Sequence, residues 1–287
     1  MAINLSKVSF AYSTPKKKQK PKYVLKDINL EIAGSDEFIT IVGHTGSGKS
    51  TLVQLLNALL ITENGDVNIF GSIVNKKNIK LKEVRKRVGL VFQFPEYQLF
   101  EETILKDVSF GPQNFGLENP EDLAKDALEK VGISKELYEE SPFSLSGGQM
   151  RRVAIAGILA SNPEVLIFDE PTVGLDPLGK KELLSLLKSL NEEYHKTIIL
   201  ITHDMEVVGS VSKRMIVLDE GDIVFDGDKD SLFRNEGIVK AHSLDYPNSV
   251  KILKDLKDKL KLDIDEYQYT IEDAYQELRR VLGDENG

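Results

Sequence analysis

The sequence predicts an α/β fold built on a parallel, doubly wound sheet, and two stretches of the chain carry this prediction. Apolar Phe38–Val42 has the length of a buried strand and leads through a glycine-rich turn into the helix-like stretch Ser50–Leu60. Apolar Val165–Phe168 is followed by amphipathic Lys180–Tyr194 and then by apolar Ile198–Ile201. Strand–helix–strand units with short links place their strands side by side in parallel.

The N-terminal part and a later segment add β-structure to this sheet. Ile3–Tyr12 and Tyr23–Ile32 are expected strands that flank a Lys- and Pro-rich loop. The five lysines of this loop could bind phosphate, but they fit a solvated hairpin tip better, because no aromatic residue lies among them. Met215–Leu218 and Ile223–Phe225 are separated by a short turn and predict a hairpin.

Helices are expected in the middle and near the C-terminal end of the chain. Within residues 82–160, which predict a helical insert, Asn119 precedes a proline and is the expected cap of a helix. Val250–Leu262 and Ile271–Leu282 carry apolar residues at helical spacing. Thr270 is the expected cap of the second of these helices.

The composition fits a chain that forms a core and lacks thiol chemistry. Hydrophobic residues make up 41% of the 287 residues and charged residues 29%, which is ordinary for a folded protein. The absence of cysteine excludes disulfides, thiol nucleophiles and thiolate metal sites, and four histidines disfavour a histidine-rich zinc cage. The net charge of −9 argues against a nucleic-acid partner, because dedicated binders usually carry a basic footprint.

Neither secretion nor membrane insertion is expected from the sequence. The first residues, MAINLSKVSFAY, lack the basic and apolar regions of a secretory signal. No apolar run approaches the ~18 residues that a transmembrane helix needs. We therefore expect a cytoplasmic protein, and a role in a membrane process would require other chains to cross the membrane.

A glycine-rich run after the strand Phe38–Val42 fits the phosphate-loop pattern G-x-x-x-x-G-K-[ST]. Its residues are Gly43, His44, Thr45, Gly46, Ser47, Gly48, Lys49, Ser50 and Thr51. Glycines let backbone N–H groups turn inward around phosphate oxygens, and the N-terminus of the following helix adds partial positive charge. Lys49 is expected to reach the β- and γ-phosphates of a nucleotide, and the Ser50 hydroxyl to ligate Mg²⁺.

Two carboxylates, Asp169 and Glu170, end the apolar strand Val165–Phe168. Adjacent charges at the end of a buried strand are costly unless solvent or opposite charge compensates them. On its own the pair would also fit a surface turn. Together with a phosphate loop, Asp169 is a natural partner of Mg²⁺ through water, and Glu170 is placed to polarise an attacking water as general base.

A second anion-binding turn is expected at residues 145–149, which read LSGGQ. The serine can cap a helix that starts near Met150, and the glycines expose backbone N–H groups. The residues concerned are Ser146, Gly147, Gly148 and Gln149. A single triphosphate seldom needs two such cradles far apart in sequence. Either one chain folds both onto one nucleotide, or two chains share nucleotides, and the spacing alone does not decide between them.

The phosphate loop, LSGGQ, the Asp169-Glu170 strand end and the downstream His203 together resemble the motifs of an ATP-binding cassette (ABC) ATPase. The resemblance covers about residues 1–231. It implies a P-loop NTPase fold with a RecA-like mixed sheet core, an N-terminal antiparallel β subdomain and a helical subdomain inserted at approximately 93–160. It further implies ATP and Mg²⁺ as ligands, and a head-to-tail dimer in which each LSGGQ completes the partner's ATP site.

The same resemblance assigns roles to residues outside the main motifs. Tyr12 matches the aromatic residue that stacks on adenine, and Gln93 matches the glutamine that senses Mg²⁺ and the attacking water. Asp176 matches the loop that communicates across the dimer, and His203 the histidine that contacts the γ-phosphate. The resemblance implies a site that is competent to hydrolyse ATP, because the general base Glu170 and the histidine His203 are both present. The implied catalytic set is Glu170, His203, Gln93 and Lys49. A GTPase is disfavoured, since residues 75–78 read NKKN rather than the guanine-reading N-K-x-D.

A narrower resemblance rests on residues 92–100 (FQFPEYQLF), 110–112 (FGP) and 145–157 (LSGGQMRRVAIAG). These stretches resemble the ATPase subunits of energy-coupling factor (ECF) transporters and related cobalt and nickel importers. The intact segment 169–176 is similar to the second of their two paired ATPase types. The resemblance implies three partners: a second similar ABC ATPase in a heterodimer, a transmembrane coupling protein, and a small membrane protein that binds a vitamin or metal ion.

In such a complex the chain would lie peripherally at the cytoplasmic face of the cell membrane and would contact the membrane only through its partners. A coupling helix of the membrane protein would dock near Gln93–Phe100. The aromatic side chains of Phe94, Tyr97 and Phe100 look exposed and suit such a groove, although ordinary packing within the helical insert would also explain them.

Residues 232–287 are expected to form a C-terminal helical extension. Its helices could cover the chain's own core or contact the sister ATPase, and we favour the second because one cassette already supplies a complete fold. Two rival functions remain: an ATPase that works as a homodimer in a conventional importer, and a soluble cassette ATPase in nucleic-acid repair or translation. The latter usually carry two cassettes, a coiled-coil insert or zinc modules, and none is found here.

Overall fold

The central sheet sets the architecture of the protein, which we describe from a computed structural model covering residues 2–12, 21–62, 64–74 and 81–283. In these residues the sheet has the strand order β10-β9-β3-β8-β7-β6. Its strands are β3 (Phe38–Val42), β6 (Val88–Val91), β7 (Val165–Asp169), β8 (Thr197–Ile201), β9 (Arg214–Asp219) and β10 (Asp222–Asp228). All neighbours pair in parallel except β9 and β10, which form the predicted hairpin. The predicted α/β class is confirmed.

Apolar side chains cover both faces of this sheet, which explains why its strands read as continuous hydrophobic runs. Successive residues of a strand point to opposite faces. In β8, Ile199 and Ile201 join one buried cluster together with helix α1, and Ile198 and Leu200 join another together with helices α5 and α6. All four side chains are fully buried. The sheet is therefore held between two cores.

The helices that flank the sheet begin slightly earlier than the sequence pattern indicates. The expected helix Ser50–Leu60 is α1 (Lys49–Leu56), and the expected Lys180–Tyr194 is α6 (Pro177–Glu192). The flanking helices also include α2 (Leu81–Arg87) and α7 (Met205–Val211). The early start of α6 has a local cause, because Asp176 accepts a hydrogen bond from the Gly179 N–H and caps the first turn.

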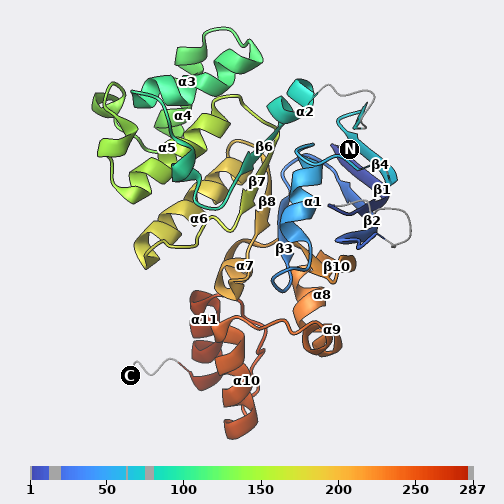
Figure 1. Ribbon diagram of the computed structural model, residues 1–287. Helices are drawn as coiled ribbons and strands as arrows, with labels where there is room; N and C mark the ends of the chain where they lie inside the picture. Colours follow the sequence, from blue (N-terminus) through green and yellow to red (C-terminus); the bar gives the residue numbers. More distant parts are fainter. Residues whose placement is uncertain (1, 13–20, 63, 75–80, 284–287) are drawn as a thin grey trace.

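A second sheet, with the order β2-β1-β4-β5, lies beside the first at the N-terminal end of the chain (Figure 1). Its strands are β1 (Ile3–Phe10), β2 (Leu25–Ile32), β4 (Asn64–Ile69) and β5 (Ser72–Ile73). The two predicted strands are confirmed, and their pairing is antiparallel. The sequence pattern missed β4 and β5. The Lys-rich loop falls mostly on residues 13–20, and the NKKN segment on 75–78, both outside the described residues.

The helical insert lies between β6 and β7 and stands away from the sheets (Figure 1). It contains α3 (Ile104–Phe115), α4 (Pro120–Lys130) and α5 (Gly147–Leu159), with short 3-10 turns at Pro95–Gln98, Lys135–Leu137 and Pro142–Ser144. One expectation was wrong in detail. Asn119 precedes α4, but it has a left-handed backbone (φ 51°) and its side chain makes no capping hydrogen bond. The proline at the first position and the acidic first turn remain as start signals.

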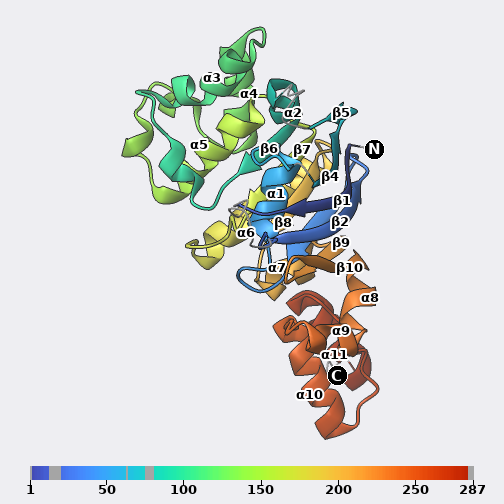
Figure 2. The same cartoon turned by 45° about the vertical axis from the view of Figure 1, so that its right-hand side comes forward.

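The C-terminal extension is helical and lies at the end of the molecule opposite the insert (Figures 1 and 2). It follows α8 (Lys229–Phe233) and contains α9 (Glu236–Ala241), α10 (Asn248–Leu260) and α11 (Ile271–Leu282). Thr270 caps α11 by accepting a hydrogen bond from the Asp273 N–H, as predicted. In the described ranges, no helix combines the length and apolar character needed to cross a bilayer.

This extension shares a core with the cassette. Phe233 is fully buried and contacts the rings of Tyr246 and Tyr269, at centroid distances of 5.8 and 5.4 Å. The same cluster includes Val42 and Val217 of the central sheet. The extension therefore covers part of the chain's own core, which was the less favoured of the two roles expected from the sequence.

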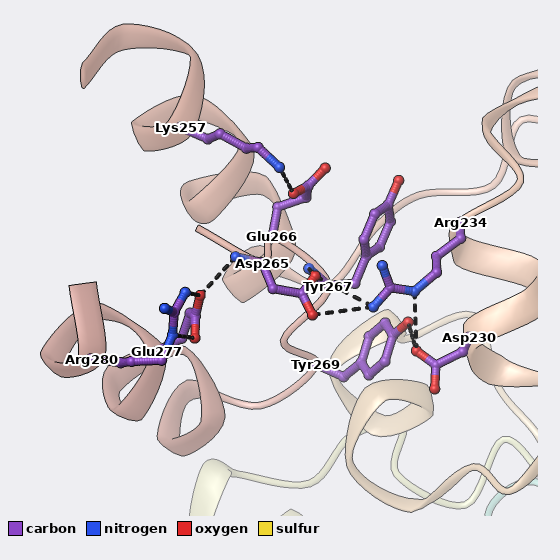
Figure 3. A network of polar contacts seen from close by, with 9 residues as sticks. All are labelled: Asp230, Arg234, Lys257, Asp265, Glu266, Tyr267, Tyr269, Glu277 and Arg280. Atoms are coloured by element: carbon purple, nitrogen blue, oxygen red, sulfur yellow. Dashed lines mark hydrogen bonds and ion pairs between the residues drawn. The ribbon is translucent and has the colours of Figure 1, made fainter. Parts of the chain in front are cut away.

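A polar network adds to these contacts between the extension and the cassette (Figure 3). The Tyr269 hydroxyl donates to Asp230 of α8 at 2.5 Å, and Arg234, the residue after α8, donates to both carboxylate oxygens of Asp265, at 3.3 and 3.2 Å. Burial, together with the hydrogen bond to Asp230, raises the pKa of the Tyr269 hydroxyl, so it remains protonated as a donor. Ring stacking and hydrogen bonds together place the extension in one position.

We expect Phe233→Ala to lower the free energy of unfolding by about 3–5 kcal/mol, because it leaves a cavity between the sheet and the extension. Urea denaturation followed by circular dichroism measures the change. Tyr275→Ala is the matched control, since Tyr275 is an aromatic residue of the extension that is 54% exposed, and its effect should stay within ~0.5 kcal/mol. Equal effects of the two substitutions would contradict a shared core.

Candidate functional site

The parallel strands bring the predicted motifs together at the carboxyl edge of the central sheet. The phosphate loop follows β3, Gln93 follows β6, Asp169 ends β7 and Glu170 follows it, and His203 follows β8. They surround a cavity of about 440 Å³. Its lining includes Thr45, Gly46, Gly48, Lys49, Ser50, Thr51, Gln93, Asp169, Glu170 and His203. In open α/β sheets this edge is the usual place for a bound ligand.

The phosphate loop has the backbone that its glycines allow. Gly43 lies at φ 147°, and a Cβ there would come within 2.1 Å of the Leu218 carbonyl oxygen. Gly48 lies at φ 107° immediately before α1. Both conformations favour glycine strongly. The loop is thus closely packed against the end of β9, and its N–H groups lead into the N-terminus of α1.

Lys49 folds back over this loop. Its Nζ donates hydrogen bonds to the carbonyl oxygens of Gly43 (2.8 Å) and His44 (2.9 Å). Burial lowers the pKa of Lys49, and the nearby charges of Glu170 and Asp169 oppose that shift only in part. The ammonium group therefore lies at the cavity with its charge incompletely compensated, where an anion would be favourable.

Asp169 lies beside Ser50 of α1. Burial raises the pKa of the Asp169 carboxyl, while a hydrogen bond with Ser50 and the charge of Lys49 oppose this shift. A hydroxyl, a carboxylate and the exposed amide of Gln93 all face the same cavity. These are the hard oxygen donors that Mg²⁺ prefers, together with phosphate oxygens. The residues present therefore fit the cation that the motifs imply.

Glu170 has an unusual backbone and one oxygen without a partner. Its φ is 49°, a left-handed value that is uncommon for glutamate. Its N–H donates to the Ile201 carbonyl at 3.1 Å, and its Oε1 accepts from His203 Nδ1 at 2.9 Å. Among the described residues, the buried Oε2 has no hydrogen-bond partner. A buried carboxylate oxygen left in this way is suited to hold a water molecule.

Tyr12 lies at the mouth of the site on the N-terminal sheet side. Its hydroxyl shares a hydrogen bond of 2.9 Å with the Thr51 hydroxyl, and the edge of its ring meets Phe10 at a centroid distance of 5.1 Å. The residue is 65% exposed. A fixed aromatic ring with an open face beside the phosphate loop can stack on a nucleobase.

The LSGGQ segment lies outside this cavity. Ser146 caps α5 in a capping box with Gln149, and the helix begins at Gly147 rather than near Met150. Gly147 and Gly148 are exposed, and apart from neighbouring residues of the same helix no described atom lies within 4 Å of a Cβ built on either. In the described chain, none of these residues lines the cavity at Lys49. Of the two possibilities left open by the sequence, this favours sharing between two chains. Asp176 is likewise exposed, at the start of α6.

Sequence reasoning missed the ion pair between Arg151 and Glu96. Arg151 of α5 donates to both Glu96 oxygens, at 3.0 and 2.8 Å, and to the carbonyl oxygens of Pro171 and Val173, each at 3.0 Å. Burial raises the pKa of Glu96, but the hydrogen bonds and charge of Arg151 outweigh this effect and lower it overall. The pair joins the segment after Gln93, the LSGGQ helix and the segment after Glu170.

Comparisons with known proteins identify the family of this chain. The family model described as "ABC transporter" matches residues 25–173. The energy-coupling factor transporter ATP-binding protein EcfA2 of Caldanaerobacter subterraneus subsp. tengcongensis is 46% identical over 98% of each chain. The protein of the same name from Bacillus subtilis is 47% identical, over 91% of this chain and 96% of that one.

Two solved structures are also similar. The cbiO1 protein of Clostridium perfringens, part of the ABC transporter complex cbiONQ, has a TM-score of 0.73 and 31% identity, covering 91% of this chain and 96% of that one. A dimeric ATP-binding cassette bound to ADP and Pi in a post-hydrolysis state has a TM-score of 0.67 and 32% identity, covering 79% of this chain and 98% of that one. The chain belongs to the ABC transporter family and, within it, to the ATP-binding proteins of energy-coupling factor transporters.

Proposed function

We propose that this chain is the ATP-hydrolysing subunit of an ECF-type importer and powers uptake of a vitamin or transition-metal ion through a partner transmembrane protein. The observation that carries the proposal is the cavity at the carboxyl edge of the sheet. It gathers Lys49, Ser50, Asp169, Glu170 and His203 around one space. This set supplies phosphate binding, oxygen ligands for Mg²⁺ and a general base.

ATP is bound by its phosphates and its base. The phosphate loop surrounds the phosphates with N–H groups, and Lys49 exchanges its contacts with the Gly43 and His44 carbonyls for phosphate oxygens. Tyr12 stacks on the adenine. Ser50, Asp169 and Gln93 would hold Mg²⁺, the last two in part through water. When bound, Mg²⁺ neutralises charge on the β- and γ-phosphates.

Glu170 polarises the attacking water. Its Oε2 is the oxygen without a partner, and its Oε1 is held by His203, so the carboxylate points one acceptor at the water. His203 donates to Glu170 in this state and turns to the γ-phosphate when ATP is present. Gln93 helps to orient the water. Hydrolysis then consists mostly of positioning and electrostatic stabilisation, as in other phosphoryl transfers.

A second, similar ATPase completes the site. The exposed glycines of LSGGQ make an anion-binding helix end that does not reach its own chain's cavity. In a head-to-tail pair, Ser146–Gln149 of each chain faces the ATP of the other, with Asp176 between the two sites. Arg151 ties the LSGGQ helix to the segments after Gln93 and Glu170, so closure of the pair is transmitted within each chain.

The transmembrane coupling protein docks at a groove between α3 and the central sheet. This groove has a volume of about 320 Å³ and is lined by Phe92, Gln98, Phe100 and Phe110, among others. Phe100 is 57% exposed and meets Phe110 edge to face at 5.0 Å. Apolar rings in a groove suit an amphipathic helix. Phe94 differs from expectation, because it is only half-exposed and lies against Arg151.

In this assembly the chain lies peripherally at the cytoplasmic face of the membrane, and a small membrane protein in the complex binds the solute. The extension contacts the sister ATPase through the exposed apolar side of α11. Ile271 is 79% exposed, Tyr275 54% and Leu282 62%. Tyr275 lies four residues after Ile271, and Leu282 seven residues after Tyr275, which are about one and two helical turns, so these side chains form an apolar stripe left over after the extension has covered its own core.

Capture of the tagged chain from detergent-solubilised native membranes tests the assembly. We expect mass spectrometry to identify a second cassette ATPase, a larger membrane protein and a small one. Recovery of a single permease with this ATPase alone would indicate a conventional importer with a homodimer. Recovery without any membrane protein would overturn the transport role.

We expect Glu170→Gln to slow ATP turnover by about 10²–10⁴-fold, the usual worth of a general base, while ATP still binds. Steady-state phosphate release and equilibrium ATP binding measure the two quantities in the assembled transporter. Glu193→Gln provides the control, because Glu193 is exposed at the far end of α6. Unchanged turnover in Glu170→Gln would refute the assignment of the base.

We expect Ile271→Ser combined with Tyr275→Ser to weaken the pairing of the two ATPases by about 10-fold or more, because the substitutions remove the apolar stripe. Dissociation constants from analytical ultracentrifugation measure the effect. Removal of the whole extension would be a poorer test, since it uncovers the core around Phe233. Ile73→Ser, which changes an exposed residue of β5, serves as the control. Unaltered pairing would leave the extension without a role at the interface.

A further inference from the structure

The phosphate loop is held from outside the loop by the turn between β9 and β10. The Gly221 N–H donates to the Ser47 carbonyl at 3.1 Å. The Asp219 side chain accepts a hydrogen bond from Nε2 of His44 at 2.8 Å. The turn between β9 and β10 therefore contacts the phosphate loop at His44 and Ser47, which lie on either side of Gly46.

Asp219 also reaches the C-terminal extension. Its second oxygen accepts from Nδ1 of His242, the residue that ends α9, at 2.7 Å. The Asp219 and His242 side chains are only 24% and 23% exposed. The hydrogen bond with His242, and then that with His44, lowers the pKa of Asp219. One ionised carboxylate thus bridges a histidine of the phosphate loop and a histidine of the extension.

Each ring nitrogen of His44 lies beside an acceptor oxygen. Its Nε2 faces Asp219, and its Nδ1 lies 2.8 Å from the Thr45 carbonyl oxygen. A neutral imidazole carries one N–H and satisfies one of these acceptors, whereas the protonated ring satisfies both. His44 contributes its backbone to the loop, and its carbonyl accepts from Lys49. The orientation of this side chain therefore bears directly on the loop that surrounds the phosphates.

His242 is held in place by the rest of the extension. It follows Val239, which is buried in the core shared with the cassette. Glu236, at the start of α9, pairs with Lys254 of α10 at 2.9 Å. The contacts between Tyr269 and Asp230 and between Arg234 and Asp265 then fix the extension to α8 (Figure 3). A histidine on such a support can act as a rigid donor to Asp219.

We propose that Asp219 is a positioning residue for the phosphate loop, and that the C-terminal extension supports the ATP site through His242. The inference rests on the proposed function, because it needs the loop to bind ATP. A glycine-rich loop loses backbone freedom when its N–H groups converge on phosphate. A fixed Asp219 reduces that loss before ATP arrives, so it strengthens ATP binding and leaves the chemical step unchanged.

The test separates binding from catalysis. His242→Ala removes one donor to Asp219, and Asp219→Asn removes the charge and one acceptor. For each variant we expect a rise of about 3–10-fold in the dissociation constant of ATP for the full chain, which corresponds to the net contribution of about one ordinary hydrogen bond acting indirectly through the loop. In the assembled transporter, KM for ATP should rise by the same factor, while kcat stays within about twofold.

The conservative variant and the controls make the test specific. His242→Asn places an amide N–H near the former Nδ1 and should restore most of the ATP affinity. His195→Ala and Asp222→Asn are matched controls, because these residues make exposed side-chain contacts with Asp36 and Lys26, away from the cavity. Both should keep the wild-type dissociation constant. His242→Ala combined with Asp219→Asn should weaken binding by less than the product of the single effects, since the two share one hydrogen bond.

Wild-type affinity and KM in either His242→Ala or Asp219→Asn would overturn the inference. A fall in kcat with no change in KM would overturn the inference as well, because that pattern would indicate a structural disturbance of the catalytic step and not weaker ATP binding. Lys49→Ala separates this failure from failure of the proposed function. If Lys49→Ala abolishes ATP binding while the Asp219 and His242 variants bind normally, only the positioning role falls. If Lys49→Ala binds ATP as well as the wild type, the ATP site itself has been misplaced.

Discussion

The parallel pairing of β3, β8 and β7 is the constraint on which the rest of the structure depends. Because their carboxyl ends meet at one edge, the phosphate loop, His203 and the Asp169-Glu170 pair lie around one cavity although they are far apart in the chain. The strands can lie in the middle of the sheet only because both of their faces are apolar and covered. The burial that stabilises these strands therefore also brings the residues of the site together.

Assembly of the site buries the carboxylates of Asp169 and Glu170 in part. Neighbouring protein groups compensate these two charges to different degrees. Asp169 has Ser50 and the charge of Lys49 nearby, whereas Glu170 keeps one buried oxygen without a described partner. A carboxylate fully satisfied by protein groups would be more stable but could not accept from a water molecule. The left-handed backbone of Glu170 belongs to the same compromise, because strain of this kind persists where the surroundings fix it and commonly marks a functional residue.

The sequence predicted what is encoded in contiguous segments. The buried strands, the phosphate loop and the Ser146 cap all depend on neighbours within a few residues, and each is present. Contacts between distant segments could not be predicted. Arg151 pairs with Glu96 across the helical insert, and Asp219 pairs with His242 of the extension, and neither pair has a spacing that signals it. Asn119 shows the converse, since a residue type that favours helix caps has a left-handed backbone here and its side chain makes no capping hydrogen bond.

The contacts of the extension with its own chain lie on both sides of the ATP site. The core of the extension is continuous with that of the cassette, and the extension also contacts α7, the helix that follows His203. The Asn248 N–H donates to Glu206 of α7 at 2.6 Å, and a Cβ on Gly209 would come within 2.5 Å of the Tyr269 carbonyl oxygen. The extension therefore contacts the phosphate loop through Asp219, and it contacts the segment after His203 directly. A partner that bound the exposed stripe of α11 would act on the extension, and its effect would reach both sides of the ATP site without any contact to ATP.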